Sequence, residues 1–155
     1  MVIGRIFAAV VALTFVLSAS AAEERAWTET LERISTGVVS IRVDSTRAFD
    51  TEWNTSSQAT GFVVDAERGL ILTNRHVVKP GPVVAEAIFV NNEEAELKAV
   101  YRDPVHDFGF YRYDPADLRF IKPAELSLDP SGAQIGREIR VVGNDAGEQI
   151  SILAG

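Results

Sequence analysis

Apolar and polar residues alternate with the two-residue period of β-strands through most of the chain. Residues 61–65 and 70–73 are apolar runs on either side of a four-residue connection that ends in Gly69, which predicts a hairpin. Further strands are predicted at residues 38–43, 83–90, 95–101, 108–113, 137–142 and 150–153. Their connections are rich in Asp, Asn, Pro and Gly. Short strands at this spacing, with no helical pattern between them, predict an all-β sandwich or barrel over residues 37–155.

Two segments depart from the strand pattern. Trp27, Leu31 and Ile34 recur at helical spacing, which predicts a short amphipathic helix from about Glu24 to Ser35 in the N-terminal segment 23–36. Gly37 is placed to end that helix. Residues 44–58 are polar, with Thr, Ser, Asn and Asp in excess, and they predict a long loop.

The first 22 residues have the pattern of a signal peptide. Arg5 precedes an uncharged, largely apolar run at residues 6–17, and small residues follow at 18–22. A membrane-spanning helix needs about 20 apolar residues, so cleavage is expected rather than anchoring. The membrane is therefore a partner only if residues 1–22 remain attached, and the protein is expected to be exported, to the periplasm or outside the cell.

Composition narrows the function classes. A chain of 155 residues with 46% hydrophobic and 24% charged residues is enough for one globular domain. Cysteine is absent, which excludes disulfides and thiolate metal sites. The formal net charge of −7 argues against nucleic acid as the main partner, because a phosphate-binding surface needs clustered Lys and Arg.

Candidate chemistry lies at the ends of two predicted strands. His76 closely follows the strand at 70–73, and Asp107 opens the strand at 108–113. A general base needs an imidazole beside a nucleophile, with a carboxylate behind the ring to fix its tautomer. Gly109, two residues after Asp107, would leave space for the ring. Thr73 and Asn74 could cap a short helical turn that projects His76 from the rim of a barrel.

Other readings of these residues are weaker. His106 is the rival imidazole, but it precedes Asp107 directly and would point to the opposite face of a strand, toward solvent. Asp103 rivals Asp107, yet its Asp-Pro sequence is typical of a turn. A metal site of His76, His106 and Asp107 is disfavoured because adjacent strand residues point apart. Asp-Phe-Gly at residues 107–109 also occurs in protein kinases, but the other kinase motifs are missing. The glycines at 132, 136, 143 and 147 do not have the spacing of a nucleotide-binding loop.

Several motifs together resemble the HtrA/DegP family of trypsin-like serine proteases. They are ATGFVVD at residues 59–65, LTNRHVV at 72–78 and DFGF at 107–110. YRDPVHDFG at 101–109 and IRVVGNDAGE at 139–148 resemble one branch of that family, which includes a fungal nuclear pro-apoptotic protease and bacterial relatives. The resemblance implies two six-stranded barrels, of which this chain is the first, preceded by a short helix. It also implies His76 as the general base, Asp107 as its orienting partner, and no cofactor.

The third catalytic group is not found in the sequence. The family carries its nucleophile in a Gly-x-Ser-Gly-Gly context in the second barrel, and no segment here matches. Ser131 is followed by Gly132 but lies in a Pro-containing turn, and we interpret it as a loop serine. Losing the nucleophile of a serine protease costs on the order of 10⁶ in kcat, so the chain alone is expected to be inactive, a fragment without the second barrel and the family's PDZ modules.

Two functions are therefore expected to compete. The resemblance implies a serine endopeptidase of protein quality control that acts on unfolded or misfolded proteins, with a homotrimer as an expectation for the full-length protein. The alternative is a non-catalytic, chaperone-like or peptide-binding barrel that holds unfolded chains on exposed apolar surface. The related fungal branch is nuclear, but the pattern of residues 1–22 favours export.

Overall fold

The computed structural model describes residues 25–45, 55–145 and 149–154 of the chain. The signal peptide expected at residues 1–22 lies outside the described residues, as does the middle of the loop expected at 44–58. No described helix has both the length and the apolar character that crossing a bilayer requires.

The N-terminal helix covers residues 25–35, within the range that the apolar spacing predicts. A turn at residues 36–37 ends it, where the Gly37 N–H donates to the Ile34 carbonyl oxygen at 2.9 Å. A Cβ at Gly37 would lie 2.2 Å from the Ala124 carbonyl oxygen. Glycine at 37 is therefore required by close backbone packing, in addition to marking the helix end.

The rest of the described chain is built from nine strands and two short 3₁₀ turns. The strands are β1 (Val38–Ser45), β2 (Ser56–Asp65), β3 (Leu70–Thr73), β4 (Val83–Ile88), β5 (Glu94–Glu96), β6 (Lys98–Arg102), β7 (Gly109–Arg112), β8 (Arg140–Asp145) and β9 (Gln149–Ala154). The turns are η1 (Pro115–Asp117) and η2 (Pro130–Gly132). The first seven strands form one antiparallel sheet in the order β5-β4-β1-β2-β3-β7-β6.

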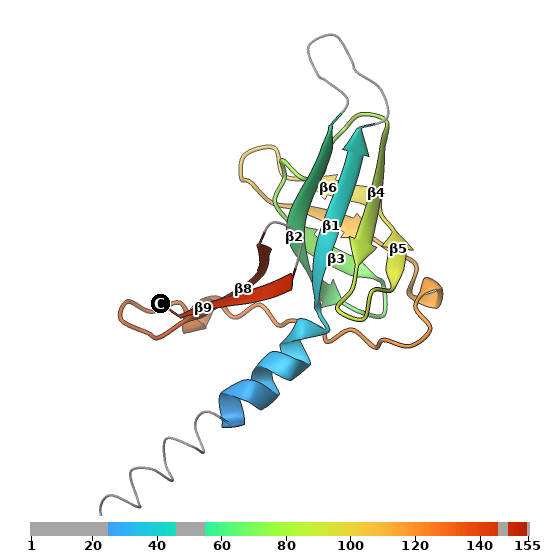
Figure 1. Ribbon diagram of the computed structural model, residues 1–155. Coiled ribbons are helices and arrows are strands. Elements are labelled where there is room, and N and C mark those ends of the chain that lie inside the picture. The colour runs from blue at the N-terminus through green and yellow to red at the C-terminus, as the bar shows by residue number, and fades with distance from the viewer. Residues whose placement is uncertain (1–24, 46–54, 146–148, 155) are drawn as a thin grey trace, which may run out of the picture. The chain divides into compact units, whose positions relative to one another are not determined.

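This sheet closes on itself because its two edge strands are consecutive in the chain. Only Leu97 separates β5 from β6, yet these strands lie at opposite ends of the strand order. The Leu97 N–H donates to the Ala85 carbonyl oxygen of β4 at 2.8 Å, which continues the pairing across the bend. Figure 1 shows the sheet curled so that β3 and β6 lie behind β1 and β2.

The fold class is confirmed. The single strand predicted at residues 95–101 is bent at Leu97 into two short strands, which pair with β4 on one side and with β7 on the other. Counted as one bent strand, they turn the seven-stranded sheet into a six-stranded barrel, the first barrel of a trypsin fold. The apolar alternation of the sequence continues through the bend to Ala99 and Tyr101, so it gave no sign of the bend, although burial ends at Leu97 and all of β6 is exposed.

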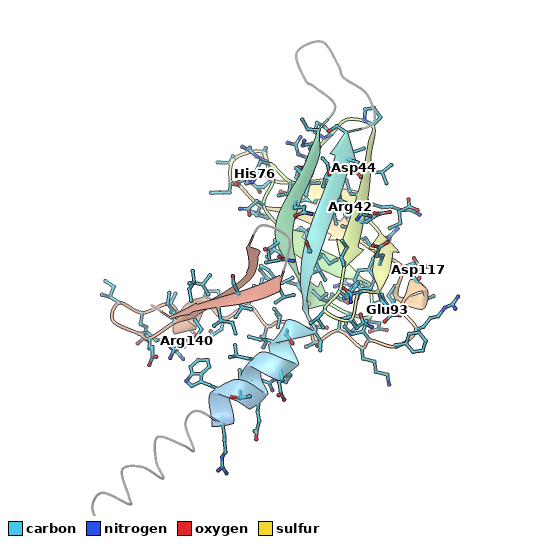
Figure 2. The ribbon with its side chains drawn as sticks, in the orientation of Figure 1. Arg42, Asp44, His76, Glu93, Asp117 and Arg140 are labelled. Carbon is cyan, nitrogen blue, oxygen red and sulfur yellow. The ribbon has the colours of Figure 1, made fainter. Side chains whose placement is uncertain are left out.

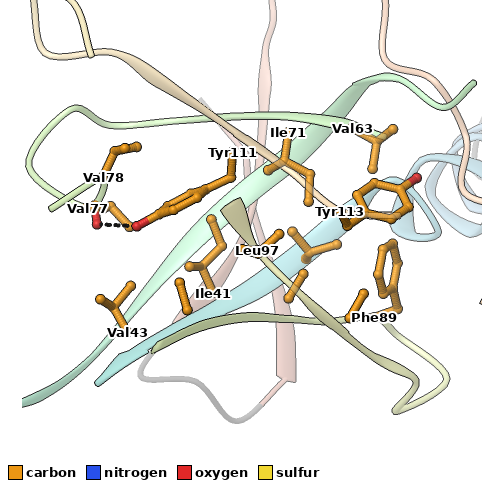
Figure 3. Close-up of a cluster of buried hydrophobic side chains, with 14 residues drawn as sticks. Ile41, Val43, Val63, Ile71, Val77, Val78, Phe89, Leu97, Tyr111 and Tyr113 are labelled. Atoms are coloured by element: carbon orange, nitrogen blue, oxygen red, sulfur yellow. Dashed lines mark hydrogen bonds between the residues drawn. The ribbon is translucent and has the colours of Figure 1, made fainter. Parts of the chain in front are cut away.

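Buried side chains from β1, β2, β3, β4, β5 and β7 fill the interior of the barrel. Val39, Ile41 and Val43 alternate inward along β1 and are at most 1% exposed. Phe89 and Tyr113 meet edge to face, with ring centroids 5.5 Å apart. Figure 3 shows this cluster, with the Tyr111 hydroxyl donating to the Val77 carbonyl oxygen at 3.0 Å. Burying each large side chain contributes about 1.5–3 kcal/mol, so the barrel is held together by its interior.

The polar loop expected at residues 44–58 is shorter than predicted. Asp44 and Ser45 continue β1, and β2 begins at Ser56, with Asp44 opposite Ser56 in the ladder. The sequence pattern assigns the polar residues at the ends of β1 and β2 to the loop because they lack an apolar face. Backbone hydrogen bonds nevertheless pair these strands beyond the barrel core, where side chains meet solvent and need not be apolar. Residues 46–54 lie outside the described residues.

The last two strands do not join the barrel sheet. β8 and β9 pair only with each other in the strand ladders described, in register from Arg140 opposite Ala154 to Asp145 opposite Gln149. This hairpin touches the barrel through Thr60, whose Oγ1 accepts from the Asn144 N–H at 2.9 Å. The predicted domain 37–155 thus contains a second, separate sheet after the barrel, since apolar alternation identifies strands but not their partners.

Candidate active site

His76 lies on a turn directly after β3. The Val77 N–H donates to the Asn74 carbonyl oxygen at 3.1 Å and closes this turn. Val77 and Val78 are buried in the barrel core, whereas 72% of the His76 side chain is exposed. Figure 2 shows His76 in the loops beside the strands. Two buried valines therefore anchor a turn that presents the imidazole to solvent.

Asp107 lies at the end of a tight loop between β6 and β7. The Asp103 N–H donates to the Phe108 carbonyl oxygen at 3.0 Å across the base of this loop. Thr73 of β3 pairs with Gly109 of β7, so the residues after Thr73 and those before Gly109 meet at the same barrel rim. The predicted meeting of His76 and Asp107 follows from this strand register.

Gly109 has a different role from the one predicted. A Cβ at this position would lie 2.8 Å from the Tyr101 carbonyl oxygen and 2.9 Å from Val78 Cγ2. The missing side chain therefore makes room for β6 and for the valine that anchors the His76 turn. No atom of the His76 ring is among the three nearest to that position.

The two side chains form a hydrogen-bonded pair. His76 Nδ1 lies 2.8 Å from Asp107 Oδ2, and the His76 backbone N–H donates to Asp107 Oδ1 at 3.1 Å. The hydrogen bond from the His76 ring is the main cause that lowers the pKa of Asp107, so this carboxyl is ionised at neutral pH. An ionised carboxylate only accepts hydrogen bonds, so Nδ1 must carry the proton. Nε2 then has a free lone pair and can act as a base.

Asp103 and His106 form a second pair on the same loop. Asp103 accepts from the backbone N–H groups of His106 and Val105, at 2.6 and 2.9 Å, and from the Tyr101 hydroxyl at 2.9 Å. The first of these is the largest cause that lowers the pKa of Asp103 to about 2. Asp103 is thus the turn residue that its Asp-Pro sequence predicts.

His106 turns toward Asp103 and away from the His76 pair. Its Nδ1 lies 3.2 Å from Asp103 Oδ1, and 75% of its side chain is exposed. The described residues contain no cluster of His, Asp and Glu suited to hold a metal ion, so the alternative metal site of His76, His106 and Asp107 is not assembled.

Ser131 lies in η2, hydrogen-bonded within its own turn. Its backbone N–H and its hydroxyl both donate to Asp129 Oδ1, at 3.1 and 2.5 Å. These bonds are the leading favourable causes that lower the pKa of Asp129. Ser131 is therefore a turn residue, as its sequence context predicts.

The two residues before His76 have roles that their sequence pattern does not predict. Asn74 was predicted to cap a helical turn, but its Nδ2 donates to Asp107 Oδ2 and to the Asp107 carbonyl oxygen, both at 3.3 Å. Arg75 Nη1 donates to the carbonyl oxygens of Asp103 and Pro104, at 3.4 and 3.2 Å. Their position beside His76 was the only signal, since their partners lie about 30 residues away in sequence.

Comparison with known proteins agrees with this architecture. Residues 59–155 match the family described as Trypsin-like peptidase domain. This chain belongs to the trypsin-like peptidase family, in its HtrA/Do-like group. Protease Do-like 7 of Arabidopsis thaliana is 58% identical over 139 residues, which cover 90% of this chain and 13% of that protein. The pro-apoptotic serine protease nma111 of Aspergillus terreus is 57% identical over 139 residues, with the same coverage.

A solved structure supports the trypsin-like fold. The HtrA-type protease AlgW, in a variant form with a tripeptide, matches with a TM-score of 0.64 at 21% identity, covering 81% of this chain and 37% of the other. At that identity the likeness concerns the fold. The trypsin-like chain spans about 13% of the length of the curated relatives it matches.

The relatives contradict the predicted localisation. Export to the periplasm or outside the cell was expected from residues 1–22, but the matching relatives are plant and fungal proteins, not exported periplasmic HtrA proteases. The prediction of export is therefore wrong. A basic residue, an apolar run and small residues form a pattern of composition alone, which many apolar segments satisfy without being a signal peptide.

Proposed function

We propose that this chain is the part of an HtrA/Do-like serine endopeptidase that supplies the general base, His76, and its orienting carboxylate, Asp107. The observation that carries the proposal is the two-point contact between these residues. One carboxylate oxygen accepts from the ring at 2.8 Å and the other accepts from the backbone of the same residue at 3.1 Å. This arrangement fixes both the tautomer and the orientation of the imidazole.

The geometry accounts for the acid–base part of peptide hydrolysis. Nε2 of His76 takes the proton of a serine hydroxyl while the serine oxygen attacks the peptide carbonyl carbon. Asp107 stabilises the resulting imidazolium without taking its proton. Nε2 then gives the proton to the amine nitrogen as the C–N bond breaks, and water repeats the cycle on the acyl-enzyme. The serine comes from outside this sequence, because no serine here has the Gly-x-Ser-Gly-Gly context.

Protein chains are the proposed substrates. HtrA-family proteases act on proteins, and the exposed imidazole at an open barrel rim suits a polypeptide that approaches from solvent. Unfolded or misfolded proteins fit best, because an extended segment can pass over the rim.

The proposal is tested in the full-length protein with casein as substrate. His76→Ala should lower kcat by about 10⁴- to 10⁶-fold, and Asp107→Asn by about 10⁴-fold. His106→Ala is the matched control, because this imidazole is equally exposed and pairs with Asp103 instead. Retained activity in His76→Ala, or an equal loss in His106→Ala, would overturn the assignment.

A covalent probe separates the chain from the whole enzyme. A fluorophosphonate, which reacts with activated serines, should label the full-length protein and leave this 155-residue chain unlabelled. Labelling of the chain would show that one of its own serines is the nucleophile.

A holding function is the second candidate. Phe120, Ile135 and Leu153 are large apolar residues in and before the β8–β9 hairpin. Phe120 is 87% exposed, Leu153 is 65% exposed and Ile135 is fully exposed. Such surface can hold unfolded chains. Suppression of citrate synthase aggregation by the chain at stoichiometric amounts, together with a proteolytically inactive full-length protein, would favour this function over the peptidase.

A further inference from the structure

The two residues before His76 bind the loop that carries Asp107. Asn74 Nδ2 reaches both the side chain and the carbonyl oxygen of Asp107, at 3.3 Å each. Arg75 Nη1 reaches the carbonyl oxygens of Asp103 and Pro104 at the start of the same loop. Asn74 and Arg75 together form a rim clamp, which holds this loop at the rim of the barrel. Three consecutive residues, from 74 to 76, therefore all attach to one loop.

We propose that Asn74 is a positioning residue for the His76–Asp107 pair, acting through the carboxylate of Asp107, with Arg75 as its support on the backbone of the loop. This inference rests on the proposed function. Asp107 Oδ2 accepts from both the His76 ring and the Asn74 amide, while Oδ1 accepts from the His76 backbone. Three donors from different directions fix the plane of the carboxylate.

The exposure of the pair explains why such positioning is needed. The side chains of His76 and Asp107 are 72% and 47% exposed. Water competes for both groups, so their mutual hydrogen bond by itself holds the orientation only weakly. Orientation of the carboxylate therefore depends on further fixed donors, and the Asn74 amide supplies one.

The strand register explains why Asn74 can supply this donor. Thr73 and Gly109 are the last pair of the β3–β7 ladder, so Asn74 leaves the sheet beside the residues that precede Gly109. The Thr73 hydroxyl donates to the Thr60 carbonyl oxygen at 2.8 Å and holds the end of β3 to β2. Asn74 thus projects from a fixed strand end, whereas Asp107 projects from a loop.

Arg75 holds the other end of that loop. Its guanidinium bonds two consecutive carbonyl oxygens, of Asp103 and Pro104, while the Asp103 side chain bonds the N–H groups that follow. The rim clamp thereby ties the loop at its start through Arg75 and at its end through Asn74. Loss of the hydrogen bonds of either Arg75 or Asn74 would let the Asp107 carboxylate move relative to the His76 imidazole.

The test uses NMR of the 155-residue chain labelled on histidine and aspartate. In the parent sequence, the neutral form of His76 should carry its proton mainly on Nδ1, which ¹⁵N shifts report. Asn74→Ala should lower the Nδ1–H fraction and raise the titration midpoint of the Asp107 carboxyl toward its ordinary value. Asn74→Leu, which nearly keeps the size of the side chain and removes its donor without adding a charge, should do the same.

Asn91→Ala is the matched control. Asn91 Nδ2 also donates to a carboxylate, Glu93 Oε2 at 2.6 Å, in a turn away from this rim. The control should leave the His76 tautomer and the Asp107 titration as in the parent chain. Unchanged tautomer and titration in both Asn74→Ala and Asn74→Leu would overturn the inference. Because Asn74→Leu nearly preserves the volume of the side chain, it gives an answer even if Asn74→Ala unfolds.

Activity of the full-length protein gives a second readout. Asn74→Ala should lower kcat by about 10- to 100-fold with KM nearly unchanged, because the pair would be misaligned without loss of substrate contacts. A fall in substrate affinity with unchanged kcat would contradict a positioning role. Should His76→Ala leave activity intact, the proposed function fails, while the NMR comparison still decides whether Asn74 orients Asp107.

Discussion

At the scale of single residues, hydrogen bonds to carboxylates organise this molecule more than ion pairs do. Asp107, Asp103 and Glu93 each accept from several backbone N–H or side-chain donors, and the pKa of each is lowered. Donors fixed by the backbone cost little entropy to align, unlike the long side chains of surface ion pairs. The loop at residues 103–108 and the segment at residues 119–121 are both held in this way.

Glu93 illustrates the principle away from the active site. Its carboxylate accepts from the N–H groups of Arg119, Phe120 and Ile121 and from the Asn91 amide. The Asn91 hydrogen bond is the largest cause that lowers the pKa of Glu93 from 4.5 to about 2. This single side chain ties the segment after η1 to the turn between β4 and β5.

The first prediction concerns how the stabilisation by the Glu93 hydrogen bonds depends on pH. Because the folded-state pKa of Glu93 is below the ordinary value, its stabilisation is present above about pH 4.5 and is lost as the pH falls toward 2. Glu93→Gln should therefore lower the urea midpoint at pH 7, and the difference from the parent chain should shrink between these pH values. A pH-independent difference for Glu93→Gln would contradict the role of its charge.

The second prediction concerns Gly109, where a side chain would meet both β6 and the anchor of the His76 turn. Gly109→Ala should destabilise the chain by about 1–3 kcal/mol, the usual range for overpacking. Gly81→Ala is the control, because nothing lies within 4 Å of a Cβ there, and it should change stability by less than about 0.5 kcal/mol. Urea unfolding at pH 7 measures both, and equal effects would contradict the packing argument.

At the scale of elements, closure of the barrel depends on the bend between β5 and β6. Leu97 is 5% exposed and stands where the chain leaves β4 and begins to pair with β7. Its side chain fills the interior while its N–H continues the ladder to β4. The two sheet edges meet at this residue, so its packing stabilises the closed form over an open sheet.

The third prediction follows from that bend. Leu97→Ala should cost about 2–5 kcal/mol, as for other large-to-small changes in a packed core. Val100→Ala, in the neighbouring strand β6 at a residue that is 54% exposed, serves as the comparison and should cost much less. Unfolding free energies from urea titration measure the two variants. A loss for Leu97→Ala as small as that for Val100→Ala would show that closure does not depend on this side chain.

At the scale of the whole chain, the barrel and the β8–β9 hairpin differ in how they bury apolar surface. The barrel encloses a continuous core of fully buried side chains. The hairpin and the segment leading to it expose Ile135, Ile139, Val141 and Leu153 by more than half. A two-stranded sheet has no interior of its own, so its apolar face remains open to further association.

The fourth prediction is that the chain associates through this surface. Light scattering should show apparent mass rising with concentration, and Ile135→Lys combined with Leu153→Lys should reduce that rise. Val84→Lys places the same charge on a half-exposed apolar residue of the barrel, β4, and should leave association unchanged. A monomer at every concentration, or an equal effect of Val84→Lys, would contradict the prediction.

Pattern and chemistry in the sequence predicted much of the fold and both members of the candidate pair. Alternation located the strands because burial on one face of a sheet imposes a period of two. His76 and Asp107 could be selected because few residue types serve as base and orienting acid, and the motifs around them resemble one family. Asn74 and Arg75 were not selected, since amide and guanidinium groups are common on surfaces and their partners lie far along the chain.

The sequence by itself therefore determined which segments are strands, which residues can carry acid–base chemistry, and the family to which the chain belongs. Only the tertiary structure decided that β5 and β6 are one bent strand that closes a barrel, that β8 and β9 stand apart from it, and that Asn74 and Asp107 meet. The physical reason is that side-chain periodicity is a local property of the chain. Strand partners and rim contacts depend instead on register between segments distant in sequence, which local pattern leaves open.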